Sequence, residues 1–116
     1  MAVVCNLFID QGSDFFVLLR YLNDDGTAID LNGYQARSQM RRSYYSANAT
    51  TFTTTIASAI NGNVTLELNA NTTANLKAGR YIYDVEVIES NTYTVTRIIE
   101  GIITVMPEVT RWVKFK

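Results

Sequence analysis

The residue types that most often catalyse reactions or bind metal ions are nearly absent from this sequence. Its 116 residues include no histidine and a single cysteine, which excludes the Ser-His-Asp triad, the Cys-His pair and most zinc sites. Cys5 lies in an apolar run without an obvious base, and we expect it to be an inert small hydrophobic residue. The sequence therefore predicts a protein that is not an enzyme and uses no cofactor or metal ion.

The carboxylates are scattered through the chain. Glycoside hydrolysis needs two carboxylates that face one cleft, and nothing in the sequence selects such a pair. The segment DDGTAID, residues 24–30, has oxygen-bearing side chains at alternate positions, but it lacks the length and final Glu of a calcium-binding loop. Asp is favoured in turns, where it accepts backbone hydrogen bonds, so we expect a turn here rather than a calcium site.

Two tyrosines, Tyr81 and Tyr83, share one face of an alternating segment. Leu76, Gly79 and Tyr81 have the spacing of a tyrosine corner, in which the hydroxyl of a Tyr bonds to backbone just upstream. A buried Tyr needs such a partner, and a glycine can adopt the unusual backbone angle at the corner. We predict that both tyrosines lie in the core, with ligand stacking as the alternative.

The segment RSQMRRSYYS, residues 37–46, is the first candidate for partner binding. It combines arginines with two adjacent tyrosines, and both residue types are enriched in interface hot spots. The alternative is a solvated strand face with one aromatic ring folded inward. The residues predicted to bind a partner are Arg37, Arg41, Arg42, Tyr44 and Tyr45.

The C-terminal segment VTRWVKFK, residues 109–116, is the second candidate. It follows Pro107 and carries the only Trp among cationic residues. We predict that it docks on a neighbour by strand addition or as a pocket anchor; the alternative is packing on its own domain. The expected division is a domain of residues 1–107 and a docking tail of residues 108–116, with Arg111, Trp112 and Phe115 as anchors.

The elements that must position these residues are short strands separated by turn signals. Period-two patterning with turn signals roughly every 8–12 residues predicts an immunoglobulin-like antiparallel β-sandwich of seven to eight strands. The run 15–22 is apolar on both faces and is expected to be a central strand. One helical turn within residues 69–79 is expected to be capped by Thr72 or Thr73. The predicted strands are residues 3–9, 15–22, 27–31, 34–42, 52–60, 64–68, 80–88 and 93–106.

Alternation also predicts which side chains point into the sandwich. In the segment 34–42, small and apolar side chains should point inward and polar ones outward; in the segment 64–69, every second residue is apolar. The expected inward residues are Ala36, Ser38, Met40, Val64, Leu66 and Leu68, and the expected outward residues are Arg37, Gln39, Arg41, Thr65, Glu67 and Asn69.

The composition of the chain limits the classes of partner that it is expected to bind. Hydrophobic residues make up 47% and charged residues 18%, which permits one packed domain. A net charge of −1 gives no basic excess for nucleic acid. No apolar run reaches the length of a membrane span, and the first residues lack the pattern of a secretory signal. We therefore expect no nucleic-acid partner, no membrane association and no secretion.

Four segments together carry a resemblance to a known class of protein. They are IDQGSDF (residues 9–15), NDDGTAIDLNGYQARSQMR (23–41), LKAGRYIYDVEV (76–87) and RIIEGIITVMPEVTR (97–111). In this order they resemble small virion proteins of tailed phages, especially contractile-tailed marine cyanophages. The chain is also similar to the N-terminal domain of baseplate upper proteins, but it ends soon after that domain.

The resemblance implies a structural module of a phage particle, made in the host cytoplasm and assembled without secretion. Its partners would be other virion proteins, as homo-oligomer or lattice neighbours, at the neck, tail, baseplate or capsid. The alternative is a carbohydrate-binding module for host adhesion, which would need a flat exposed row formed by Tyr44, Tyr45 and Tyr93.

Overall fold

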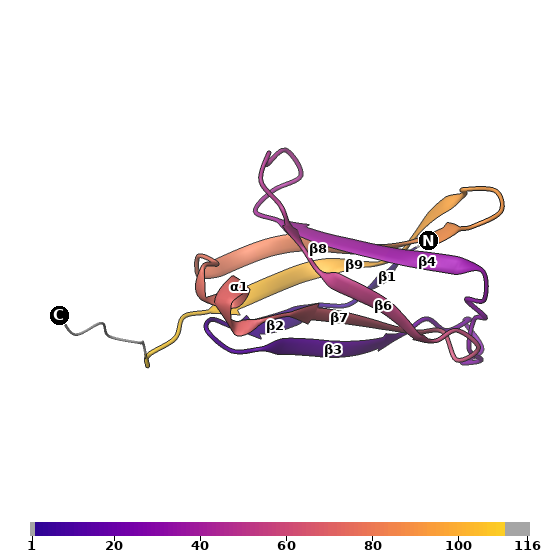
Figure 1. The fold of residues 1–116 in the computed structure, drawn as a ribbon, viewed down its shortest axis with the longest axis horizontal. Coiled ribbons are helices and arrows are strands. Elements are labelled where there is room, and N and C mark those ends of the chain that lie inside the picture. Colours follow the sequence, from indigo (N-terminus) through magenta and orange to yellow (C-terminus); the bar gives the residue numbers. More distant parts are fainter. Residues whose placement is uncertain (1, 111–116) are drawn as a thin grey trace.

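The computed structural model describes residues 2–110 and arranges them as two β-sheets packed face to face (Figure 1). The larger sheet has the strand order β1-β9-β8-β4-β5, with β2 also paired to β9, and the smaller has the order β3-β7-β6. The strands of this described part are β1 (Val3–Val4), β2 (Leu7–Asp10), β3 (Phe15–Arg20), β4 (Tyr34–Arg41), β5 (Thr50–Thr51), β6 (Thr53–Ser58), β7 (Asn63–Leu68), β8 (Gly79–Glu89) and β9 (Val95–Met106).

The connections between the sheets are those of an immunoglobulin-like sandwich. The chain passes from β3 in the smaller sheet to β4 in the larger, returns through β6 and β7, and ends in the β8–β9 hairpin. The predicted immunoglobulin-like β-sandwich is therefore confirmed, but the described residues form nine strands instead of seven to eight. Two pairings differ from the antiparallel expectation, because β1 and β2 both run parallel to β9.

The N-terminal segment, predicted as one strand, is interrupted at Cys5 and Asn6. The Cys5 amide donates to the Glu100 carbonyl at 2.8 Å, while the Asn6 side-chain oxygen accepts from the Ile102 amide at 3.0 Å. The side chain of Asn6 thus accepts the β9 hydrogen bond that a backbone carbonyl would accept in a regular strand. Because the chain stays attached to β9 through the interruption, β1 and β2 lie along the same strand.

The core lies between the sheets and follows the predicted alternation. Val64, Leu66 and Leu68 of β7 are each at most 7% exposed, as predicted. Thr65, predicted to point outward into solvent, is also buried at 6%. The reason is its place on the central strand of the smaller sheet, where Leu18 and Thr55 flank it in register.

The prediction that residues 15–22 form a central strand was wrong. The segment becomes β3, which pairs with β7 and forms one edge of the smaller sheet. Its alternate side chains Phe16 and Leu18 remain 63% and 48% exposed. The strand is an edge because β1 and β2, the segments that precede it, attach to β9 in the other sheet.

The predicted strand at residues 27–31 is also absent from the described structure, where only an isolated bridge joins Leu22 to Ala28. A turn replaces it. The Asp25 carboxylate accepts from the Thr27 amide at 2.9 Å and from the Thr27 hydroxyl at 2.6 Å. These bonds give the aspartate the turn-forming role expected from the sequence.

The helical turn is α1 (Ala70–Ala74), and its cap was assigned to the wrong residue. Asn69 is the N-cap, since its side-chain oxygen accepts from the Thr72 amide at 2.8 Å. Thr73 is fully buried: its hydroxyl donates to the Ser13 carbonyl at 2.8 Å and accepts from the Gly12 amide at 3.1 Å. The helix therefore anchors the loop between β2 and β3. At five residues, α1 is too short to cross a membrane, and it is the only helix in the part of the chain described.

Candidate functional site

The tyrosine-corner residues form a structural unit at the start of β8. The Tyr81 hydroxyl donates to the Lys77 carbonyl at 2.8 Å, and the ring is 7% exposed. Gly79 has a φ of 128°, which a residue with a side chain rarely adopts. Leu76 is 8% exposed and packs in the core.

Arg42, one of the predicted partner-binding residues, belongs to this corner. Its guanidinium lies 5.0 Å from the centre of the Tyr81 ring and donates to the Ala78 carbonyl at 3.3 Å. A cation over an aromatic face is attracted by the ring quadrupole. Arg42 therefore has contacts within its own domain that account for its position.

Tyr83, the second tyrosine of the pair, links the larger sheet to the N-terminal segment. Its hydroxyl donates to the Cys5 carbonyl at 2.5 Å, and its ring is 5% exposed. Burial, with Cys5 as a further cause, raises the pKa of the Tyr83 hydroxyl. Both tyrosines are buried and both hydroxyls donate to backbone carbonyls, so the pair lies in the core as predicted.

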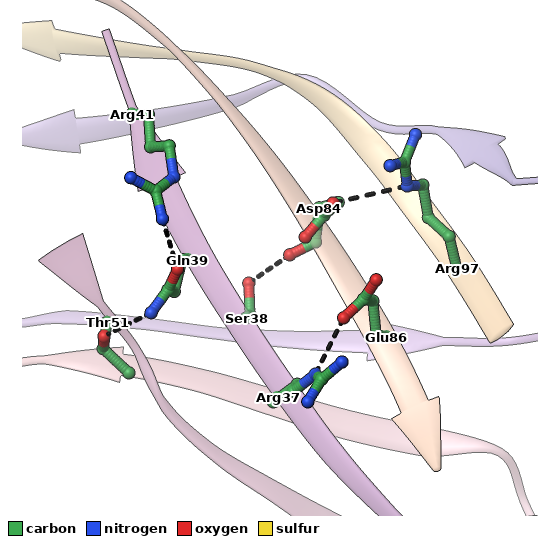
Figure 2. Close-up of polar contacts among 8 residues, drawn as sticks. All are labelled: Arg37, Ser38, Gln39, Arg41, Thr51, Asp84, Glu86 and Arg97. Carbon is green, nitrogen blue, oxygen red and sulfur yellow. Dashed lines mark hydrogen bonds and ion pairs between the residues drawn. The ribbon is translucent and has the colours of Figure 1, made fainter. Parts of the chain in front are cut away.

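Charged side chains from three neighbouring strands meet on the outer face of the larger sheet (Figure 2). Arg37 of β4 pairs with Glu86 of β8 at 2.7 Å, measured from Nε to Oε1. Arg97 of β9 approaches Asp84 of β8, with 3.3 Å between Nε and Oδ2, and its Nη1 lies 3.9 Å from Glu100 Oε2. We call these residues, together with Gln39 and Arg41, the charged face.

Arg41 extends the charged face toward the loop between β4 and β5. Its guanidinium donates to the Gln39 side chain at 3.1 Å and to the Ser46 carbonyl at 2.8 Å. Gln39 in turn donates to the Thr51 hydroxyl at 3.1 Å (Figure 2). These bonds tie the loop that carries Tyr44 to the strand beneath it.

A β-bulge places Arg97 on this face. Val85 pairs with Ile99, whereas the next residue, Glu86, pairs with Arg97, so Ile98 is the extra residue of β9. Ile98 and Ile99 are consecutive and both are buried. Without the bulge, strand alternation would turn Arg97 toward the core.

Sequence reasoning missed Arg97, Asp84, Glu86 and Glu100 as members of a site. The signal that could have revealed them is the apolar pair Ile98-Ile99 between two charged residues, which breaks the period of two and marks a bulge. Predicted site residues Arg37 and Arg41 do lie on the charged face.

A shallow hollow of about 700 Å³ lies on the same face. Beside Arg41, Asp84, Arg97 and other charged residues, it is lined by apolar side chains and by the predicted residue Tyr44. Several of these carbon surfaces are open to solvent: Val4 is 70%, Tyr44 74% and Ile102 41% exposed. Exposed apolar surface rimmed by polar groups is typical of an interaction site.

The exposed tyrosines do not form the flat row that sugar stacking would need. Tyr44 and the 97% exposed Tyr45 lie in the loop after β4, while Tyr93 lies in the turn between β8 and β9. The register of β4 with β8 puts these two loops at opposite ends of the strands (Figure 1). The predicted anchors Arg111, Trp112 and Phe115 lie outside the described residues.

No metal site accompanies the hollow. Within residues 2–110, no group of three or more Cys, Asp or Glu side chains is arranged to hold a metal ion. The guanidinium groups neutralise the neighbouring carboxylates instead. The arrangement suits recognition of a polar or charged surface.

The surroundings of Asp84 disfavour its ionised form. Burial, followed by repulsion from Glu86, raises the pKa of the Asp84 carboxyl above its ordinary value of 3.8, and Arg97 and Arg37 offset only part of that rise. A folded-state pKa above the unfolded value means that ionised Asp84 costs folding free energy. This cost is fully present at neutral pH and vanishes as the pH falls below the unfolded value.

We therefore expect Asp84→Asn to raise the midpoint of thermal unfolding at pH 7, with the gain disappearing near pH 3. Circular dichroism across this pH range measures the effect. Asp25→Asn is the matched control with the opposite sign, because hydrogen bonds from Thr27 lower the pKa of Asp25. An Asp84→Asn variant less stable than wild type at pH 7 would contradict this description of the charged face.

Comparison with known proteins found structural likeness only, at low sequence identity. The sequence matches no protein-family model, and no curated protein is significantly similar to it in sequence. Listeria monocytogenes InlP aligns with 88% of the chain at 16% identity and a TM-score of 0.49. The Lin-41 filamin domain aligns with 78% at 14% identity and a TM-score of 0.36, over 81% of its own length.

A family 123 glycoside hydrolase from Clostridium perfringens aligns with 91% of the chain at 16% identity and a TM-score of 0.39. The chain spans about a quarter of the length of InlP and of this hydrolase, 26% and 23% respectively. Their activities carry no argument about this chain.

Proposed function

We propose that this chain is a non-enzymatic structural module of a phage virion that docks on neighbouring virion proteins through the charged face and its hollow. One observation supports the proposed docking surface: Arg97, Arg41 and Tyr44 lie beside exposed apolar side chains on one sheet. The assignment to a phage particle rests on the sequence resemblance described above.

The physical chemistry of the charged face favours a role in recognition over a role in stability. The side chains of its ion pairs are 27–58% exposed, and such pairs contribute about 0–1 kcal/mol to folding. The ionised form of Asp84 opposes folding, because its pKa is raised. A partner with complementary charges would remove water from these groups and gain orientation and specificity from them.

The immunoglobulin-like sandwich suits this role because its sheet fixes the backbone positions of these residues. Arg37, Asp84 and Arg97 stand on β4, β8 and β9, three adjacent strands of one sheet. A rigid surface loses little conformational entropy on binding. The predicted C-terminal anchors would add a second, tethered contact, and repeated copies on a particle would strengthen both by multivalency.

Deleting residues 112–116 tests the contribution of the tail. We expect the truncated chain to fold but to be lost from assembled particles, because its apolar and cationic anchors are gone. The measurement is quantitative mass spectrometry of purified particles, with circular dichroism as the control for folding. A truncated chain that enters particles as well as wild type would refute the docking role of the tail.

A further inference from the structure

Strand β3 leaves one edge of the smaller sheet unpaired within the described structure. It pairs with β7 over six consecutive residues, without a register shift, and β7 lies on one side of it. The other side carries backbone donors and acceptors that are free to pair with an added strand. The strand that could have covered this edge, the N-terminal segment, is attached to β9 in the other sheet.

This edge lacks the features that protect exposed edges. Proline, charged side chains and bulges are the usual means of preventing strand addition. β3 has no proline, lysine or bulge, and its one charged residue, Arg20, lies at its end. Its outward side chains include Phe16 and Leu18, which are 63% and 48% exposed. An apolar and regular edge of this kind is suited to an interface.

The sequence of the edge is complementary to itself. Around Val17, the segment DFFVLLR (residues 14–20) places an acidic and a basic residue at equal distances from the centre, with apolar residues between them. In an antiparallel pair of two copies centred on Val17, Asp14 of each copy lies opposite Arg20 of the other, and Phe16 lies opposite Leu18. Directly opposed residues point to the same face, so all of these contacts form at once.

From this pattern we propose that β3 pairs antiparallel with β3 of a second copy of the chain, around a two-fold axis at Val17. The two smaller sheets then form one continuous sheet with the order β6-β7-β3-β3-β7-β6. A two-fold interface requires a self-complementary surface, which this segment supplies. On the inner side, Phe15 lies opposite Leu19 and continues the core across the axis.

The charges at the two ends are available for this pairing. Among the described residues, neither Asp14 nor Arg20 forms an ion pair within its own copy. One oxygen of Asp14 accepts from the Ala70 amide at 2.8 Å, on the β7 side of the strand. Pairing with the arginine therefore uses the second oxygen of the carboxylate or replaces this bond. Opposite charges favour this register, and a shift by two residues would separate them.

The proposal goes beyond the proposed function and does not depend on it. The dimer would leave the charged face free, because that face belongs to the other sheet. The test uses the purified chain in solution, so its outcome is separate from incorporation into particles.

The experiment uses size-exclusion chromatography with light scattering on the full chain. Wild type is expected to have the mass of two chains of 13.0 kDa each. Arg20→Glu places like charges opposite each other at both ends and should raise the dissociation constant by roughly tenfold or more. Asp14→Arg should do the same. Arg80→Glu, on β8 of the other sheet, is the matched control and should remain a dimer.

Mixing the two variants gives the decisive result. In a pair formed by one Arg20→Glu chain and one Asp14→Arg chain, both ends again carry opposite charges, so the dimer should return. Circular dichroism checks that each variant folds. A monomeric wild type, an undiminished Arg20→Glu dimer, or a mixture of folded variants that stays monomeric would overturn the proposal.

A cross-link keeps the proposal testable if Asp14→Arg fails to fold. In a Cys5→Ser background, Val17→Cys places two thiols opposite each other on the axis, and oxidation should give a covalent dimer. Thr55→Cys, on β6 at the far edge of the same sheet, should stay monomeric. Failure of Val17→Cys to cross-link more than Thr55→Cys would also overturn the proposal.

Discussion

The Arg97→Ala variant is expected to fold normally but to compete poorly with wild type for incorporation into particles. Arg97 is the residue that the bulge turns outward between Asp84 and Glu100. Its loss leaves the neighbouring carboxylates without the cation that they share. The charged face, on which positive and negative side chains otherwise offset each other, then becomes acidic, which disfavours the proposed docking. As a hot-spot arginine of the docking surface, Arg97 would contribute about 2 kcal/mol to binding, or roughly 30-fold in affinity.

The measurement is a competition inside the particle. Wild type and Arg97→Ala are produced together, one with an isotopic label, and their ratio in purified particles is compared with their ratio in the cell. Arg80→Ala on β8 is the matched control, since Arg80 lies outside the hollow and the charged face. Equal incorporation of Arg97→Ala and wild type would contradict the role given to the charged face.

Replacing Gly101 by alanine is expected to cause a large loss of stability. A Cβ at this position would lie 2.2 Å from the Cys5 carbonyl oxygen, far inside normal contact. That same oxygen accepts the hydrogen bond of the buried Tyr83 hydroxyl. The N-terminal segment must therefore move away from β9, which exposes core and leaves Tyr83 without its partner.

We expect a loss of about 1–3 kcal/mol for Gly101→Ala, the usual cost of overpacking a well-packed site. Urea denaturation measures it, and the rate at which iodoacetamide alkylates Cys5 reports the local displacement. Gly26→Ala is the control, because a Cβ there meets no atom within 4 Å and only the positive φ is strained. Unchanged stability and unchanged Cys5 reactivity in Gly101→Ala would show that the segment is not held as described.

The local sequence pattern was sufficient to predict much of the sandwich. Alternation identified the inward side of β7, and the spacing from Leu76 to Tyr81 identified the corner, because both depend on neighbouring residues along one strand. The outward placement of Arg37 and Arg41 followed from the same period. These features needed no knowledge of which strands become neighbours.

Features that depend on strand order could not be predicted from the sequence. The apolar run at residues 15–22 is typical of a central strand, yet β3 is an edge because the preceding segment joins the other sheet. Arg97 was missed because a bulge changes the facing of every residue before it in β9. Arg42 was assigned to a partner surface because its contact with Tyr81 joins residues far apart in the chain.

The central claim, that the charged face docks on a neighbouring virion protein, is tested most directly by photo-cross-linking in assembled particles. A photoreactive phenylalanine replaces Gln39, an exposed residue of the charged face, or Thr55 on the exposed side of β6 as the control. We predict that position 39 gives a single adduct with another virion protein, identified by mass spectrometry, and that position 55 gives no such adduct. Particles that contain the chain but show no adduct from position 39, or the same adduct from both positions, would contradict the account.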